Sequence, residues 1–358
     1  MKYQKINNQT GLTVIELMIG LMLSLLLVGG VIQVYLGTKS TYSVTEGMSR
    51  LQENTRFSMD MMASDIRMAG YIPCSRPETT TNTVVPTSWW TAFFDNPIKG
   101  FEDGANPFPD DSSNEVAVGT DSILILRGGD KVAGVNLLDA SNNEIILQRN
   151  LETEDEWVED GSLMIACDAT HASLFQADDI QSSVATTVEI ASGSGDVPGN
   201  TSTDLGHAFG NDAQISNYKA VVYYVSDAVS GDGYSLYRRY LNTNGSKQNT
   251  VIKEELIEGI ESMQILYGLD TDSTADGVAD RYVKADAIND DEWGSVVSVR
   301  VGILYASEDG LRDEEGTDNK TYIVANTSIG VTSDQDETHA QDRRKRYVSN
   351  MTVNIRNI

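Results

Sequence analysis

The sequence predicts an α+β protein in which one long N-terminal helix packs on a β-rich globular head. An uncharged apolar run over residues 17–36 has the length of a membrane-spanning helix. Helical spacing of apolar residues continues beyond this run to Ala69. After Cys74 the pattern changes to short apolar runs bounded by Gly, Asn and Asp, which is typical of strands.

The head is predicted to be strongly acidic. The chain has 358 residues and a formal net charge of −27, although residues 1–76 contribute +2. The remaining residues therefore contribute −29. This charge argues against nucleic acid as a partner, because phosphates are bound through Lys and Arg. It suits a solvated surface in a saline or calcium-containing medium.

The N-terminal segment allows three interpretations. Lys2 and Lys5 precede the apolar run, so the short N-terminus is expected to stay in the cytoplasm. A secretory signal would end in a small-residue cleavage site, and Thr-Lys-Ser at 38–40 is a poor one. A plain membrane anchor leaves Glu16 unexplained, because an acid at the bilayer centre costs about 2.5–3.5 kcal/mol.

The third interpretation explains both the length and the acid. The stretch GLTVIE, from Gly11 to Glu16, follows a basic leader and resembles the signal of type IV pilins and type II secretion pseudopilins. The resemblance implies that prepilin peptidase cuts after Gly11, that Leu12 is N-methylated, and that the apolar run becomes the packing core of a filament. The predicted segments are a cleaved leader, a transmembrane and filament-core half of the helix, an amphipathic half and the head: 1–11, 12–36, 37–70 and 71–358.

Glu16 is then expected to make an assembly contact. Cleavage creates a positive amine on Leu12, and a carboxylate four residues later lies within helical reach of it or of a neighbouring subunit's amine. Pairing the two charges offsets much of the desolvation that each would suffer alone. The resemblance implies that this contact sets the register of an incoming subunit. The alternative is a chance acid near the membrane interface.

The amphipathic half of the helix is expected to run to residue 69 and to stop near Gly70, with Pro73 as a second terminator. A helix from residue 12 to residue 69 would be about 87 Å long. Its apolar face must be covered by the head, because nothing else is available to bury it. The members of this face are Met48, Leu51, Thr55, Met59, Met62, Ile66 and Ala69.

Strands are expected throughout the head. Residues 218–227 and 233–242 form a predicted hairpin with a Gly-Asp-Gly turn. The polar segments 77–120, 178–212 and 306–342 are expected to be loop insertions. The other predicted strands are 121–128, 144–150, 161–168, 262–270, 295–309 and 347–358.

Three blocks of the head resemble the PilW family of minor pilins, which is related to the J-type pseudopilins. They are "DIRMAGYIPC" (65–74), "IACDATHASLFQ" (165–176) and "LIEGIESMQILYGLDTD" (256–272). The resemblance implies a minor pilin that helps to initiate type IV pilus assembly in a tip complex. The implied partners are prepilin peptidase, other minor pilins, the major pilin and the inner membrane. The implied location is the inner membrane with a periplasmic head, and then the pilus at the cell surface. A J-type pseudopilin is the alternative, although its heads are usually smaller.

The two cysteines, Cys74 and Cys167, form no CxxC motif. Behind an export signal the expected state is one disulfide. Closing a loop of this length would stabilise the fold by about 4–5 kcal/mol on the chain-entropy model. The alternative is two buried free thiols. The first two PilW-like blocks hold one cysteine each, so the resemblance supports the pairing, which would join the end of the helix to a strand.

Catalysis has little support in the sequence. His171, His207 and His339 are isolated along the chain, and neither HExxH, GxSxG, a P-loop nor a zinc spacing is present. We therefore expect no enzyme, and a membrane-tethered hydrolase is the least favoured class. His171 is expected to be a packed or surface histidine.

One loop is a candidate calcium site. Asp270, Asp272, Asp276 and Asp280 lie in a short loop that contains glycine, and calcium prefers carboxylate oxygens on such loops. The match to an EF-hand fails, because the glycine is not at position six and Arg281 replaces the bidentate Glu. The alternative is a solvated acidic turn.

Two further segments allow two interpretations each. The basic run "RRKRY" (343–347) is either a solvated charged edge or a patch that docks on an acidic face of another pilin subunit. The aromatic segment "SWWTAFF" (88–94) is either a buried clamp under a loop or the exposed patch of a pilus-tip adhesion module.

Overall fold

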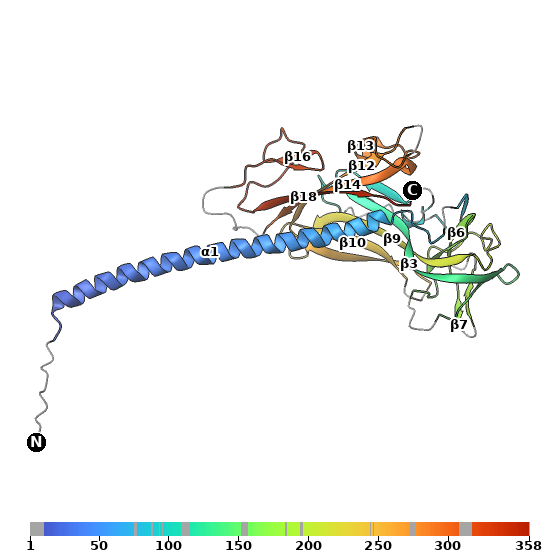
Figure 1. The fold of residues 1–358 in the computed structure, drawn as a ribbon, viewed down its shortest axis with the longest axis horizontal. Helices are drawn as coiled ribbons and strands as arrows, with labels where there is room; N and C mark the ends of the chain where they lie inside the picture. The colour runs from blue at the N-terminus through green and yellow to red at the C-terminus, as the bar shows by residue number, and fades with distance from the viewer. Residues whose placement is uncertain are drawn as a thin grey trace, which may run out of the picture.

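The computed structural model confirms one long helix and a β-rich head (Figure 1). The helix, α1, spans Val14–Arg67 and projects far beyond the head. The predicted α+β architecture is therefore confirmed, whereas residues 1–10 of the predicted leader lie outside the described residues. The structure describes residues 11–357 except 75–76, 87–88, 93, 95, 109–114, 152–156, 183–184, 194–195, 244, 246, 273–275 and 308–316.

Helix α1 begins and ends close to the predicted positions. Its 54 residues give a length of about 81 Å. Thr13 is the N-cap and Met68 the C-cap. Gly70 follows with a φ of +70°, a left-handed conformation that glycine adopts without strain.

The larger sheet has eleven strands. Its main path runs β1-β6-β5-β9-β3-β4-β8-β7, while β2 pairs with β3, and β10 joins β9 to β11. The predicted hairpin is confirmed as β9 and β10. The strands are β1 (Thr79–Asn82), β2 (Ile98–Phe101), β3 (Ser122–Asp139), β4 (Glu144–Leu147), β5 (Leu163–Cys167), β6 (His171–Gln176), β7 (Ile180–Ser182), β8 (Thr186–Glu189), β9 (Gln214–Asp227), β10 (Tyr234–Asn242) and β11 (Thr250–Glu258).

A four-stranded sheet, of order β13-β12-β14-β18, lies on the other side of α1, and a small sheet of β15, β16 and β17 completes the head. The chain passes from β11 to β12 through Gly259, where a side chain would meet the Ala306 carbonyl oxygen at 2.5 Å. The strands are β12 (Ile260–Leu269), β13 (Arg281–Val283), β14 (Val296–Ala306), β15 (Tyr322–Val324), β16 (Thr327–Gly330), β17 (Glu337–Thr338) and β18 (Arg346–Asn354). Short 3-10 turns are η1 (Trp89–Thr91), η2 (Ala285–Ala287) and η3 (Trp293–Ser295).

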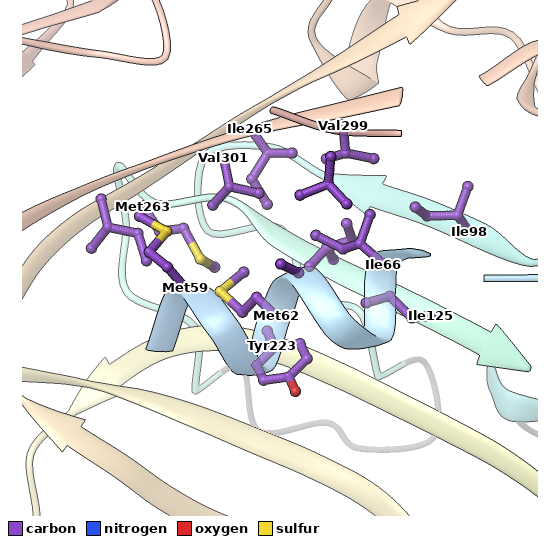
Figure 2. Packing of buried hydrophobic residues seen from close by; sticks show 14 of the residues in the cluster. Met59, Met62, Ile66, Ile98, Ile125, Tyr223, Met263, Ile265, Val299 and Val301 are labelled. Carbon is purple, nitrogen blue, oxygen red and sulfur yellow. The ribbon is translucent and has the colours of Figure 1, made fainter. Parts of the chain in front are cut away.

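The C-terminal half of α1 fills the space between the two larger sheets. Met62 and Ile66 are fully buried there. Figure 2 shows their side chains between Tyr223 of β9 on one side and Ile265 and Val301 of the four-stranded sheet on the other. The helix is therefore part of the main hydrophobic core of the head.

The three predicted loop insertions contain strands, which corrects the sequence prediction. Strands β1 and β2 lie within 77–120, β7 and β8 within 178–212, and β15 to β17 within 306–342. These strands are two to four residues long. Runs of two to four residues are too short to show the alternation of apolar and polar residues that marks a strand in the sequence.

Candidate functional site

The projecting half of α1 is bare. Every residue from 11 to 43 is exposed, and most of the side chains from Leu12 to Tyr42 are large and apolar. Among the described residues, α1 alone is long and apolar enough to cross a membrane, judged by length and composition. Because an exposed apolar surface of this size is rare on soluble monomers, it requires a lipid or protein environment.

The N-terminus of α1 is closed by a capping box formed by Thr13 and Glu16. The backbone N–H and the hydroxyl of Thr13 each donate to Glu16 Oε2 at 2.9 Å. In return, the Glu16 N–H donates to Thr13 Oγ1 at 3.3 Å. The negative charge also lies at the positive end of the helix dipole. Glu16 therefore has a local partner within its own helix.

This local role was missed at the sequence level, although Thr followed three residues later by Glu is a known helix-start pattern. Leu12 directly precedes the cap and its side chain is 78% exposed. The amine that cleavage would create on Leu12 would therefore lie beside the capped carboxylate. The contact between Glu16 and a neighbouring subunit stays a prediction, as do cleavage after Gly11 and methylation of Leu12.

The buried face of α1 is the one that the spacing predicted. Met48 is half-buried, and the other six residues of the predicted face are buried. The burial begins where α1 enters the head, so one helix has an unpartnered half and a clamped half. The clamped half fixes the direction in which the bare half projects.

Polar contacts fix the position of the clamped half of α1 within the head. The hydroxyl groups of Ser58 and Tyr305 lie 2.7 Å apart. The buried Asp65 accepts a hydrogen bond from the Tyr223 hydroxyl at 2.6 Å and one from Arg127 Nη2 at 3.0 Å. Burial and the neighbouring Asp65 carboxylate raise the pKa of Tyr223, which keeps its hydroxyl a donor. These contacts were not predicted, because their partners are 62 to 247 residues away in the chain.

The end of α1 is also fixed covalently. Cys74 follows the helix and is joined by a disulfide to Cys167, the last residue of β5. This is the pair that the resemblance implied, and neither cysteine is free. Between helix and disulfide, the Gly70 N–H donates to the Leu126 carbonyl at 3.0 Å. The turn after α1 is therefore attached both to β3 and to β5.

Two of the three histidines, although isolated along the chain, lie close together in the fold. The rings of His171 and His207 stack at 5.2 Å. His207 Nε2 lies 2.6 Å from Asp168 Oδ2, and Thr81 Oγ1 lies 2.8 Å from His171 Nε2. Burial opposes ionisation of Asp168, but N–H donors from Thr170 and His171 outweigh it and lower the pKa to about 2. The cluster joins β1 and the segment containing His207 to β6.

The predicted calcium loop uses its carboxylates internally. Asp280 Oδ2 accepts from the N–H groups of Thr271 and Asp272, at 2.7 and 3.0 Å. Asp270 Oδ2 accepts from the Gly277 N–H at 2.8 Å. Residues 273–275 lie outside the described part of the loop. Within the described ranges, no three His, Cys, Asp or Glu side chains are grouped as a metal site. Calcium binding stays a prediction.

Both interpretations of the basic run (343–347) are wrong for Arg346, which is neither solvated nor free to dock on another subunit. The Arg346 side chain is fully buried. Arg346 Nη2 donates to Glu261 Oε1 at 2.7 Å and Nη1 donates to Asp342 Oδ1 at 2.8 Å. Burial alone would lower the pKa of the Arg346 guanidinium, but Glu261 and Asp342 outweigh this effect and raise the pKa. Arg344 is paired with Asp232 at 2.7 Å.

The aromatic segment fits the interpretation of a buried clamp. Trp90 is 3% exposed, and its carbonyl accepts a hydrogen bond from the Tyr218 hydroxyl at 2.7 Å. Trp89 packs edge-on against Phe108 with ring centroids 5.8 Å apart. Phe93 lies outside the described residues.

Comparison with known proteins finds a family match within the head. Residues 222–357 match the family model of the type IV pilus-assembly protein W, PilW. The resemblance to PilW is confirmed. The PilW match begins within β9 and includes the whole four-stranded sheet, which clamps α1. It includes Tyr223 and Tyr305, the two tyrosines that bond to the helix.

One solved structure is similar at a distance. It is a type IV-like pilin from Thermus thermophilus, with 9% identity and a TM-score of 0.32. The alignment covers 86% of this chain and 96% of that one. No curated protein matches the chain.

Proposed function

We propose that this chain is a minor pilin that helps to initiate type IV pilus assembly in a tip complex with other minor pilins. The observation that carries the proposal is the two-part helix. One half is buried in a head whose sequence matches PilW, and the other half exposes an apolar surface that needs neighbours. A filament of helices supplies such neighbours.

The proposed pathway starts in the inner membrane. The apolar half of α1 anchors the precursor there, with the head in the periplasm. Prepilin peptidase cuts after Gly11, and the new N-terminus at Leu12 is methylated. The subunit then leaves the lipid for the filament, where its helix packs against those of other minor pilins and of the major pilin.

Glu16 acts in this last step. In the precursor its carboxylate closes the capping box with Thr13. In the filament it compensates the amine of Leu12, either on its own chain or on the preceding subunit. Since neither charge is solvated by lipid or by packed helices, the pair favours entry of a subunit in one register.

The proposed role is structural rather than catalytic. Its chemistry consists of burying an apolar helix and placing the faces of the head against neighbouring subunits.

A deletion strain tests this function against its nearest alternative. We expect deletion to reduce surface pili strongly while type II secretion continues, and we expect the intact gene to restore the pili. Sheared pili are counted by electron microscopy, and secreted enzymes are assayed in the same cultures. Normal pili together with lost secretion would instead assign the chain to the J-type pseudopilins.

A further inference from the structure

Residues 202–208, which we call the strap, connect two fixed points of the head. At one end, the Thr201 N–H donates to the Thr83 carbonyl at 2.7 Å. At the other end, the Leu138 N–H of β3 donates to the Phe209 carbonyl at 2.9 Å. The strap itself belongs to no helix or strand. Its middle is therefore positioned by contacts that involve side chains.

The middle of the strap lies against β6 and β1. Ser173 Oγ of β6 donates to the Leu205 carbonyl at 2.7 Å. The Leu205 side chain is 1% exposed and belongs to the hydrophobic cluster that contains Phe175 of β6. A side chain at Gly206 would meet Thr81 Oγ1 of β1 at 2.6 Å. The strap thus covers an apolar part of the head at close range.

The two stacked histidines lie in this same contact. His207 belongs to the strap, and His171 is the first residue of β6. Their ring planes are 12° apart, and Phe209 lies edge-on to both rings, at 6.1 and 5.1 Å. His171 is only 6% exposed. Because a buried charge lacks the solvation that water provides, this packing favours a neutral His171 ring.

One acid faces the histidine pair. Asp168, in the turn between β5 and β6, lies with its Oδ2 2.6 Å from His207 Nε2. Asp204 of the strap accepts a backbone N–H within the strap itself, and Glu78, before β1, is exposed. Strands β1, β5 and β6 contain no charged residue other than His171. The Asp168 carboxylate can therefore compensate one imidazolium of the pair but not two.

The cost of the second proton has a definite sign. Burial and the neighbouring His207 ring lower the pKa of His171, and the Asp168 carboxylate opposes this shift without cancelling it. Since the pKa lies below the value of 6.5 for a free side chain, the closed strap binds this proton less tightly than an open one. The contribution of His171 to closure is thus present above 6.5 and is lost as the pH falls below that value.

We propose that the strap is an acid-sensitive cover. A second proton on the pair of His171 and His207 releases the strap and exposes Leu205 together with the apolar cluster to which it belongs. The ends at Thr201 and Phe209 stay bound, so the opening is local. This device is separate from the assembly role of α1, because every residue that takes part in it belongs to the head.

Hydrogen exchange followed by mass spectrometry measures the opening in the full-length chain in detergent micelles. Exchange is compared at about pH 7.5 and about pH 5, on either side of the ordinary histidine pKa, with correction for the effect of pH on the chemical exchange rate. We expect strap peptides to lose protection at the lower pH. The hairpin of β9 and β10 should keep its protection, because its own backbone ladder holds it.

Two substitutions test the histidine pair. His171→Phe keeps a flat ring that takes no proton, and His207→Gln keeps a donor for Asp168 without a second charge. Both variants should keep the strap protected at the lower pH. His339→Gln is the matched control, because His339 is also buried but bonds to the Lys320 carbonyl rather than to the strap. It should lose protection in the strap as the wild type does.

Three outcomes would overturn the proposal. The first is equal protection of the wild-type strap at both pH values. The second is an acid loss that persists in His207→Gln, which is decisive even if His171→Phe packs poorly, because the His207 side chain is 33% exposed and tolerates the change. The third is a loss that extends to the hairpin of β9 and β10, since the opening would then not be local.

Discussion

At the scale of single residues, Glu16 combines two roles that can be separated. Its carboxylate caps α1 through Thr13, and we propose that its charge compensates the Leu12 amine in the filament. Gln retains a side-chain oxygen for the cap but lacks the charge. Thr13→Ala removes the hydroxyl of the cap and leaves the charge.

We therefore expect Glu16→Gln to be inserted and cleaved normally but to enter pili poorly, and Thr13→Ala to enter pili nearly as well as the wild type. Immunoblots of sheared pili and of the membrane fraction measure this partition. If Thr13→Ala were excluded from pili while Glu16→Gln entered them, the carboxylate would act only through the cap.

A second residue, Asp121, links the two large sheets. It directly precedes β3, and its Oδ2 accepts from the Ile265 N–H of β12 at 2.8 Å. Burial and the nearby Glu102 carboxylate raise the pKa of Asp121 to about 8, against the effect of its backbone donors. Since this pKa is above the value of 3.8 for a free side chain, the folded state binds the proton more tightly than the unfolded state.

The contribution of Asp121 to stability is thus complete below about pH 4 and is lost as the pH rises through about 8. We expect the free energy of unfolding to decline up to that pH, and Asp121→Asn, which mimics the protonated acid, to flatten the decline. Urea titrations at several pH values measure both. The same decline in the variant would show that another group is responsible.

At the scale of elements, the clamped half of α1 stabilises the head by packing in the core between the two larger sheets. Met62→Ala removes a fully buried side chain from the core between the sheets, and we expect a loss of about 2–5 kcal/mol in the free energy of unfolding. Phe57→Ala is the control, because Phe57 lies on the same helix but is 49% exposed. Its effect should stay within about 0.5 kcal/mol.

Urea unfolding of the full-length chain, followed by tryptophan fluorescence, gives both values. Trp293 is buried in the same core as Met62, and Trp90 is buried in a second hydrophobic cluster of the head. Similar losses for Met62→Ala and Phe57→Ala would mean that α1 is not clamped as described.

The sequence could predict α1, its buried face and most of the longer strands, because their apolar residues follow a local period. The nine-residue strand β11 was not predicted. The spacing of apolar residues is enough to predict the seven-residue face from Met48 to Ala69. Local sequence is also enough to predict the hairpin of β9 and β10. Sequence could not predict the short strands or the Arg346 cluster. The acids that pair with Arg346 come from β12 and from the chain before β18. Only the folded sheets bring these acids around Arg346.

The candidate site could be predicted in part for the same reason. The apolar run and Glu16 are local features of the sequence. The contacts of Asp65 with Tyr223 and Arg127 join α1 to β9 and β3, so local pattern does not reveal them.

At the scale of the whole molecule, charge and shape divide the chain into two parts. The acidic residues are concentrated in the head, while the projecting helix is apolar and bare (Figure 1). The disulfide between Cys74 and Cys167 and the buried face of α1 fix these parts to each other. The bare half can then be inserted among other helices as a rigid extension of the head.

The central claim is that this bare helix is exposed by cleavage after Gly11 and retained in the mature protein. The most direct test is mass spectrometry of the N-terminal peptide of the chain isolated from membranes and from sheared pili. The account predicts a peptide that begins at an N-methylated Leu12 in both fractions. A chain that still begins at Met1, or one trimmed near Ser40 so that the apolar helix is lost, would contradict it.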